Sequence, residues 1–275
     1  MGSRREVLVS HYLDKGLEAP YFISEWGGIA GAKIRNEGKK TIHISSFGVQ
    51  FDWEEEGDLW WRESCSIELA PGDEKTLPDI AFRISIDAEP KAHTYILGIR
   101  LEEFRENEWV GLGRYVLDEK HILIKEYPKR DFMVFISHSN HPDDETLTNL
   151  TNDLLENCGI DAYVAEKKGE PGEGLWSKIK KSIKASDAII VLWTKYAKTS
   201  GDIREEIGTA VGMEKYEQII PVVEEGGELA GSLRGKEWAT LDREKPKKAL
   251  IEAIEKILIE AEKKPPIHRP VSIKP

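Results

Sequence analysis

The sequence predicts two domains of different fold class, an all-β domain over residues 1–126 and an α/β domain with a parallel sheet over residues 130–263. In the first half, apolar and polar residues alternate in short runs that turn-forming residues separate, as in antiparallel sheets. In the second half, continuous apolar runs alternate with stretches of helical period, which is typical of βαβ units. The proline-rich residues 264–275 are expected to form an extended tail.

In the first half, several short strands at this spacing favour an antiparallel β-sandwich. The pattern is similar to that of the immunoglobulin-like modules that lie beside catalytic domains in many prokaryotic proteins. The strands are expected within residues 32–38, 39–53, 66–86, 93–101 and 109–117.

Six tryptophans allow two interpretations, a platform for a carbohydrate ligand or packing within the two domains. Because sandwich cores and interfaces use tryptophan heavily, packing is the favoured interpretation. These residues are Trp26, Trp53, Trp60, Trp61, Trp109 and, in the second half, Trp176.

The second half reads as an ordered alternation of strands and helices. Strands are predicted over residues 131–139, 160–166, 187–194 and 218–224, and helices over residues 144–159, 175–186, 203–216 and 246–264. In open parallel sheets, ligands bind outside the carboxyl ends of the strands. That rule brings together Ser137, His138 and Ser139, residues 166–173 and residues 194–200 along one rim.

The amino-acid composition indicates which partners, metals and cellular location are expected for this protein. The formal net charge of -11 disfavours nucleic acid and anionic membranes as partners. No apolar stretch is long enough for a signal peptide or a membrane span. The two cysteines, Cys65 and Cys158, have no neighbour at metal-ligand spacing, so no metal site is expected and a reducing, cytoplasmic location fits best.

The familiar motifs of phosphate binding and serine hydrolysis are missing from the sequence. No GxGxxG, GxxxxGK[ST] or GxSxG pattern follows a predicted strand. Adjacent residues of a strand point to opposite faces, which disfavours a dyad of Ser137 and His138. Hydroxyl and backbone contacts to a polar ligand are the favoured use of this segment.

The stretch SGDIREEIGTA, residues 200–210, places two acids at the start of a helix. Asp202 is predicted to be the N-cap, with Glu205 at the third helical position of a capping box and directed to solvent. Glu206 lies at the edge of the apolar stripe that contains Ile203 and Ile207. Two interpretations of Glu206 stay open here, a structural salt bridge and a partly desolvated carboxylate aimed at the rim.

Three segments of the second half together resemble the Toll/interleukin-receptor (TIR) domain family, in particular prokaryotic TIR proteins of antiviral defence. The likeness covers roughly residues 130–260 and implies a flavodoxin-like fold. The segments are DFMVFISHSNHPDDE, the long run from CGIDAYVAE to SGDIREEIGTA, and IIPVVEEG.

Many prokaryotic TIR domains cleave NAD⁺ between nicotinamide and ribose. Their pattern around the catalytic acid is a serine, one residue, an aromatic, an aliphatic, two residues and a glutamate. The resemblance therefore implies Glu206 as the catalytic residue and Ser200 as the serine, with Asp202 where the family usually has the aromatic.

The resemblance also implies which other residues contact the substrate. Ser137, His138 and Ser139 are expected near the nucleotide. Residues 167–174 correspond to the BB loop, which gates the site and mediates TIR–TIR contacts. The further substrate-binding candidates are Lys167 and Gly172 in this loop, Trp176 just after it, and Ser200.

The leading hypothesis is an NAD⁺ nucleosidase that self-association activates, with the β domain as sensor or oligomerisation module. NAD⁺ is its substrate, and no cofactor or metal is expected. The product is ADP-ribose or a cyclic isomer. The alternative is a non-catalytic TIR scaffold that assembles through BB-loop contacts, which Asp202 favours. A nucleotide-binding receiver domain is a weaker third possibility, because residues 135–139 offer no phosphoacceptor aspartate.

Overall fold

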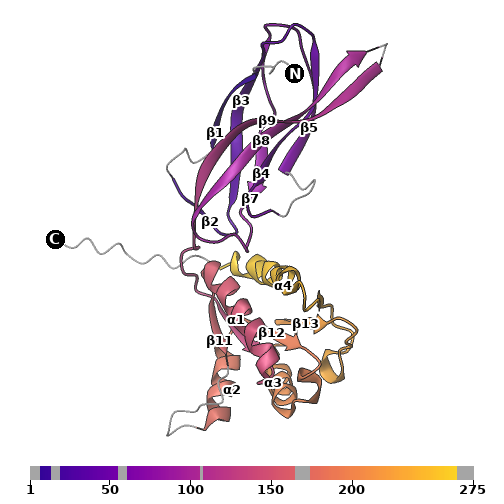
Figure 1. The fold of residues 1–275 in the computed structure, drawn as a ribbon. Coiled ribbons are helices and arrows are strands. Elements are labelled where there is room, and N and C mark those ends of the chain that lie inside the picture. The colour runs from indigo at the N-terminus through magenta and orange to yellow at the C-terminus, as the bar shows by residue number, and fades with distance from the viewer. Residues whose placement is uncertain (1–6, 14–18, 55–60, 106–107, 165–173, 265–275) are drawn as a thin grey trace, which may run out of the picture. The chain divides into compact units, whose positions relative to one another are not determined.

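The computed structural model describes residues 7–13, 19–54, 61–105, 108–164 and 174–264. The chain divides into two compact units, Met1–Lys125 and Glu126–Pro275 (Figure 1). Apart from Lys264, the predicted tail lies outside the described residues.

The first unit is largely β, as predicted, and its strands form two sheets. One sheet has the order β1-β3-β6, with β7 also paired to β3, and the other has the order β2-β9-β8-β4-β5. The pairings are antiparallel except that of β2 with β9. The strands are β1 (Val7–Leu13), β2 (Tyr21–Phe22), β3 (Trp26–Asn36), β4 (Ile42–Phe51), β5 (Trp61–Leu69), β6 (Glu74–Thr76), β7 (Ile80–Arg83), β8 (Ala92–Arg105) and β9 (Glu108–Lys125).

Aromatic side chains join the two sheets. The ring of Phe82, on β7, lies 4.9 Å from that of Phe51 on β4 and 5.7 Å from that of Tyr21 on β2, measured between centroids. A Cβ at Gly27 would lie 2.5 Å from the Tyr21 ring, so only glycine fits there. The sheets therefore pack against each other through a close-fitting aromatic core.

The tryptophans of this unit have different surroundings. Trp53 stacks on Phe51 at 4.3 Å between ring centroids, which is a packing role. Trp26 is 60% exposed and meets Trp61 edge-on at 6.2 Å. Trp60 and the side chain of Trp109 lie outside the described residues.

The second unit alternates strands and helices around a parallel sheet, as predicted. The three-residue strand β14 is an addition that the periodicity does not reveal. The elements are β10 (Met133–Ser137), α1 (Pro142–Asn157), β11 (Asp161–Val164), α2 (Leu175–Ala185), β12 (Ala188–Trp193), the 3₁₀ turn η1 (Ala197–Thr199), α3 (Gly201–Gly212), β13 (Ile219–Glu224), the 3₁₀ turn η2 (Gly231–Leu233), β14 (Ala239–Leu241) and α4 (Pro246–Ala261).

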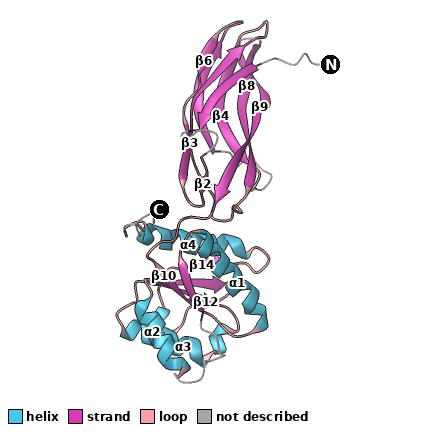
Figure 2. Ribbon diagram, turned by 90° about the vertical axis from the view of Figure 1, so that its left-hand side faces the viewer, coloured by secondary structure: helices cyan, strands magenta, loops and turns pink. Residues whose placement is uncertain are grey.

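The five parallel strands have the spatial order β11-β10-β12-β13-β14. Numbered along the chain within this unit, that order is 2-1-3-4-5, the flavodoxin-like arrangement. Figure 2 shows the sheet between α1 and α4 on one side and α2 and α3 on the other. All six residues of β12 are buried, as expected for a central strand covered on both faces.

None of the helices in the described part of the chain combines the length and the apolar character needed to cross a membrane.

Candidate functional site

The strand order places a topological switch point between β10 and β12. The chain leaves β10 towards one neighbour, β11, and returns to form the other neighbour, β12. Ligands of open α/β sheets bind at such a point, outside the carboxyl ends of the strands. Ser137, the last residue of β10, is paired with Val191 of β12 and so lies at this position.

A hydrogen bond joins Ser137 to Glu206 at the switch point. The Ser137 Oγ donates to Glu206 Oε2 across 2.6 Å. Ser137 is 1% exposed and Glu206 5% exposed, in agreement with the helical phase that puts Glu206 beside the apolar stripe. Ile203 and Ile207, its neighbours on α3, belong to the core between the helix and the sheet. The site thus holds a carboxyl group with a short hydrogen bond in a largely apolar setting.

Burial governs the protonation of this carboxyl group. Loss of solvent raises the pKa of Glu206 from 4.5 to about 7. The hydrogen bond from Ser137 acts in the opposite direction, and the negative charge of Asp202 adds to the rise. Near neutral pH the group is therefore poised between its neutral and ionised forms, which is a property of functional carboxyl groups.

The start of α3 differs from the prediction. The N-cap is Ser200, with extended backbone, and its Oγ accepts a hydrogen bond from the N–H of Ile203 at 3.4 Å. The prediction of Asp202 as N-cap was wrong, because Ser200 already supplies the acceptor and Gly201 begins the helix. Asp202 is the second helical residue, so Glu205 does not stand at the third position of a capping box, although it is exposed as predicted.

His138 and Ser139 have different roles from Ser137. His138 is half-buried, and burial lowers the pKa of its imidazole, which favours the neutral ring. Ser139 Oγ accepts a hydrogen bond from the N–H of His141 at 3.1 Å and so supports the turn into α1. Of the three residues, Ser137 is the one whose side chain forms a hydrogen bond with Glu206 in the described part of the chain.

The remaining predicted site residues divide into two groups. Lys167 and Gly172 lie outside the described residues. Trp176 is half-buried and packs against the core between α2, α3 and the sheet, with Lys180 Nζ 5.5 Å from its ring centroid. Its indole therefore has a packing role here.

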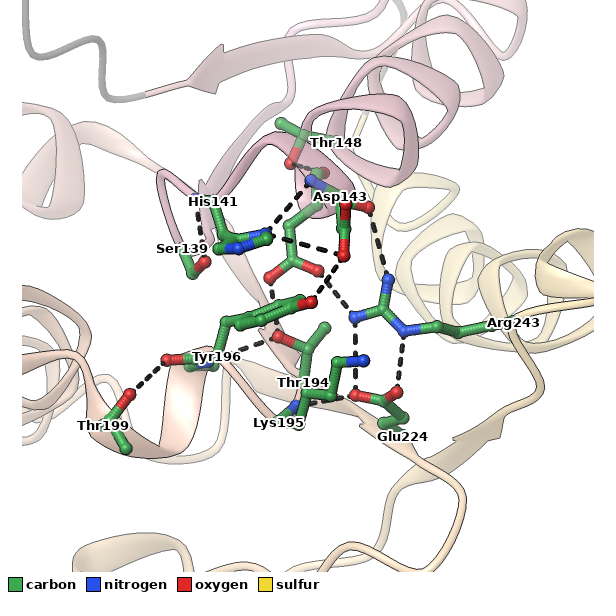
Figure 3. A network of polar contacts seen from close by, with 12 residues as sticks. Ser139, His141, Asp143, Thr148, Thr194, Lys195, Tyr196, Thr199, Glu224 and Arg243 are labelled. Atoms are coloured by element: carbon green, nitrogen blue, oxygen red, sulfur yellow. Dashed lines mark hydrogen bonds and ion pairs between the residues drawn. The ribbon is translucent and has the colours of Figure 1, made fainter.

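A second cluster on the same rim has no counterpart in the sequence prediction (Figure 3). Arg243, two residues after β14, lies between Asp144 of α1 and Glu224 at the end of β13. Its Nη2 is 2.7 Å from Asp144 Oδ1, and its Nε is 2.7 Å from Glu224 Oε1. The sequence contains one indication of this cluster: Glu224 stands at the end of a strand and Arg243 just after one, where the rim of the sheet lies.

Charge pairing governs the ionisation of Arg243 and Glu224 in this cluster. The hydrogen bond to Glu224 raises the pKa of Arg243, and the bond to Asp144 adds to the rise. Burial raises the pKa of Glu224, but the bonds from Arg243 and from the backbone N–H of Lys195 lower it further than burial raises it. Asp144 and Glu224 both accept hydrogen bonds from neighbouring side chains or backbone N–H groups, so the cluster stabilises the local structure.

Within the part of the chain that the structure describes, no three His, Cys, Asp or Glu side chains are grouped as metal ligands would be. Both cysteines are free thiols, with Cys158 buried and Cys65 partly buried.

Comparison with known proteins identifies the α/β half. The family model described as "TIR domain" matches residues 134–258. The TIR domain of the Toll-related receptor TRR-2 from Hydra magnipapillata is 20% identical, over 47% of this chain and 99% of that chain, with a TM-score of 0.38.

Two further solved structures are similar to this chain. A prokaryotic SEFIR domain is 26% identical, over 50% of this chain and 99% of its own, with a TM-score of 0.37. The TIR domains of the activated Roq1 resistosome are 20% identical, over 46% of this chain and 71% of that chain, with a TM-score of 0.31. A search of curated proteins found no match. The family match shows that residues 134–258 of this chain are a TIR domain.

Proposed function

We propose that this protein is an NAD⁺ nucleosidase of the prokaryotic NAD-cleaving TIR type. It would break the bond between nicotinamide and ribose. Attack of water on the ribose carbon, with loss of a proton, would give ADP-ribose, and attack of an adenine or ribose group of the same molecule would give a cyclic ADP-ribose isomer. The observation that carries the proposal is the buried carboxyl group of Glu206, hydrogen-bonded by Ser137 at the switch point of the sheet. A buried acid with a strongly raised pKa at the ligand-binding edge of an α/β sheet is a candidate for catalysis.

The proposed chemistry needs a negative charge more than it needs a proton donor. Nicotinamide leaves NAD⁺ as a neutral base, so the leaving group is already activated. The transition state is oxocarbenium-like, as in glycoside hydrolysis. An ionised Glu206 would accept hydrogen bonds from ribose hydroxyls and stabilise the positive charge that develops on the sugar. The scheme uses NAD⁺ as substrate and involves no cofactor or metal.

The other candidate contacts complete the substrate site in this proposal. Ser137 is the partner of the catalytic carboxylate, while His138 and Ser139 follow it at the rim. Ser200 caps the helix that carries Glu206. The remaining substrate-binding candidates are Lys167, Gly172 and Trp176.

The β half completes the proposal as an immunoglobulin-like sandwich that senses a trigger or drives oligomerisation. Activation would follow from homotypic TIR–TIR association, in prokaryotic antiviral defence or signalling. The net charge of -11 supports a protein without nucleic acid or anionic membrane as partner, and the two cysteines without partners at metal-ligand spacing fit a reducing, cytoplasmic location.

A TIR scaffold without turnover is the second candidate. The observation that favours it is the 5% exposure of Glu206, whose Oε2 already accepts the Ser137 hydrogen bond. In this candidate the acid has a structural role, Asp202 replaces the ring that shapes the pocket, and the BB loop mediates assembly.

Product analysis separates the two candidates. The full chain, at high concentration and with a crowding agent, is incubated with NAD⁺, and nicotinamide, ADP-ribose and its cyclic isomers are measured by mass spectrometry. Glu206→Gln, which lacks the proposed catalytic carboxylate, is the negative control for nicotinamide release. Nicotinamide release by the wild type alone supports the nucleosidase. A wild type that assembles, as light scattering would show, but releases no more nicotinamide than this control supports the scaffold.

A further inference from the structure

We propose that Arg243, Asp144 and Thr194 are positioning residues for Glu206. They fix the connection between β12 and α3, residues 194–200, and thereby the helix that carries the carboxyl group. The inference rests on the proposed function and deepens it, because it names residues on other elements that the reaction would depend on.

The arrangement begins with one guanidinium group that holds two carboxylates (Figure 3). Arg243 contacts Asp144 Oδ1 through Nη2 and Glu224 Oε1 through Nε, each at 2.7 Å. The side chain of Asp144 is 0% exposed and that of Glu224 is 17% exposed. Two acids brought together at such burial need a cation between them. The planar fork of arginine supplies it with fixed geometry.

The two carboxylates in turn hold consecutive residues of the chain. Asp144 Oδ2 accepts a hydrogen bond from Thr194 Oγ1 at 2.6 Å. Glu224 Oε2 accepts one from the backbone N–H of Lys195, also at 2.6 Å. These are the first residues after β12. The guanidinium group therefore determines, through the two acids, where the chain goes when it leaves the central strand.

Thr194 passes this constraint to the start of α3. Its Oγ1 accepts the N–H of Ala197 at 3.2 Å, and its carbonyl accepts the N–H of Lys198 at 3.2 Å. The N–H of Ser200, the N-cap of α3, donates to the carbonyl of Ala197 at 3.0 Å. Arg204, on the first turn of α3, donates from Nη2 to the carbonyl of Lys198 at 2.6 Å. A continuous series of hydrogen bonds thus runs from Asp144 to the helix of Glu206.

Small displacements of Glu206 have large consequences in this scheme. A misplacement of about 1 Å at a reacting group can lower a rate about 10²-fold. Loss of the series would also let water approach the carboxyl group, whose pKa depends on its burial. The positioning role therefore has two readouts, the turnover number and the ionisation of Glu206 in the free protein.

Four variants of the full chain test the proposal. Arg243→Ala removes the guanidinium group. Thr194→Val removes the hydroxyl and keeps the shape of the side chain, whereas Thr194→Ser keeps the hydroxyl. Lys264→Ala is the matched control, since Lys264 Nζ forms an ion pair of 2.5 Å with Asp187, just before the amino end of β12.

The kinetic assay measures kcat and KM for nicotinamide release, and ¹³C NMR of labelled glutamate carboxyl groups measures the pKa of Glu206. The Glu206→Gln spectrum identifies the resonance. For Arg243→Ala and Thr194→Val we expect kcat to fall about 10²-fold, with a smaller change in KM. In both, the pKa of Glu206 should move towards its ordinary value. Thr194→Ser and Lys264→Ala should keep wild-type values in both measurements.

The possible outcomes all bear on the proposal. Equal kcat and equal Glu206 pKa in Thr194→Val and Thr194→Ser overturn it, and they do so even if Arg243→Ala fails to fold. If wild-type protein releases no nicotinamide, the proposed function fails. In that case the NMR comparison alone decides whether these residues position the carboxyl group.

Discussion

Ser137 and Glu206 are 69 residues apart in the sequence, yet the Ser137 hydroxyl donates a 2.6 Å hydrogen bond to the Glu206 carboxyl group. The bond joins the end of the first strand of the TIR domain to the helix that follows its third strand. Both partners are buried. A carboxyl group in such a place is costly to ionise, and departures of this kind from an apolar core concentrate at functional sites.

The adjacent acids of α3 should differ sharply in activity assays. Glu206→Gln keeps the side-chain volume but cannot carry the negative charge, so nicotinamide release should fall by at least about 10²-fold. Glu205→Gln changes an exposed side chain on the same helix and should retain most activity. Initial rates of nicotinamide release, measured side by side, provide the check. Equal rates in the two variants would contradict the assignment of Glu206.

Activity should depend on pH through the ionisation of Glu206. The pKa of this group is about 7, and the proposed mechanism uses the ionised form. The kcat/KM of the wild type should therefore rise with pH through about 7 and level off above it. A profile that is flat from pH 5.5 to 8.5 would show that no such group governs the reaction.

Ser137→Ala should shift that profile. The Ser137 hydrogen bond favours the ionised carboxylate, so its loss should raise the pKa of Glu206 further. The midpoint of the kcat/KM profile would then move to higher pH. Ser186→Ala is a matched control, because this serine is as buried, at 1% exposure, and its hydroxyl donates to the carbonyl of Ser182. A midpoint that moves equally in both variants would argue against a specific role for Ser137.

Glu206 should also make stability depend on pH. Because its pKa is about 7 in the folded protein against an ordinary value of 4.5, the folded state binds the proton more tightly. Its contribution to the free energy of unfolding therefore decreases as pH rises from about 4.5 to about 7 and stays low above that range. Glu206→Gln should stabilise the TIR domain by roughly 3 kcal/mol at pH 8 and by little at pH 4.5.

Urea denaturation of both proteins at the two pH values checks this prediction. The comparison between variants cancels the other titrating groups. A gain that is the same at both pH values would indicate better packing of glutamine and not relief of a buried charge.

Periodicity predicted much of the TIR domain because its helices, of 11 to 16 residues, are long enough to show a helical period and alternate with apolar strands. β14 was not predicted, because its three residues, Ala239–Leu241, are too few to show a period. The cap of α3 was misassigned because Ser200 and Asp202 are both good capping residues two positions apart. Local sequence does not say which of them has extended backbone.

Long-range polar contacts were the least predictable part of the site. Helical phase put Glu206 beside the core, and the alternation of strands and helices suggested the rim on which Ser137 lies. Neither reveals that Arg243 lies against Asp144, 99 residues away, because arginine and aspartate are common on surfaces. Pairing at that distance depends on the order of the strands in the sheet, which the sequence pattern leaves open.

Gly159 provides a stability prediction that is independent of the proposed function. It follows α1, has a φ of +71°, and a Cβ there would lie 2.4 Å from the carbonyl oxygen of Pro128. Its own carbonyl accepts the N–H of Arg130 at 2.7 Å, so this backbone approach fixes the entry of the chain into β10. Gly226 has nearly the same φ, +72°, but a Cβ there would meet nothing within 4 Å.

Alanine substitutions at Gly159 and Gly226 therefore distinguish the cost of backbone strain from the cost of a steric conflict at the added Cβ. Gly226→Ala should cost about 1–2 kcal/mol of unfolding free energy, from the left-handed backbone alone. Gly159→Ala carries the same strain and must also displace a backbone carbonyl, so its cost should exceed that of Gly226→Ala by at least about 1 kcal/mol. Urea denaturation of the full chain, followed by the transition of the TIR domain, measures both. Equal costs in the two variants would mean that the Pro128 carbonyl moves away freely and that the contact at Gly159 contributes nothing to stability.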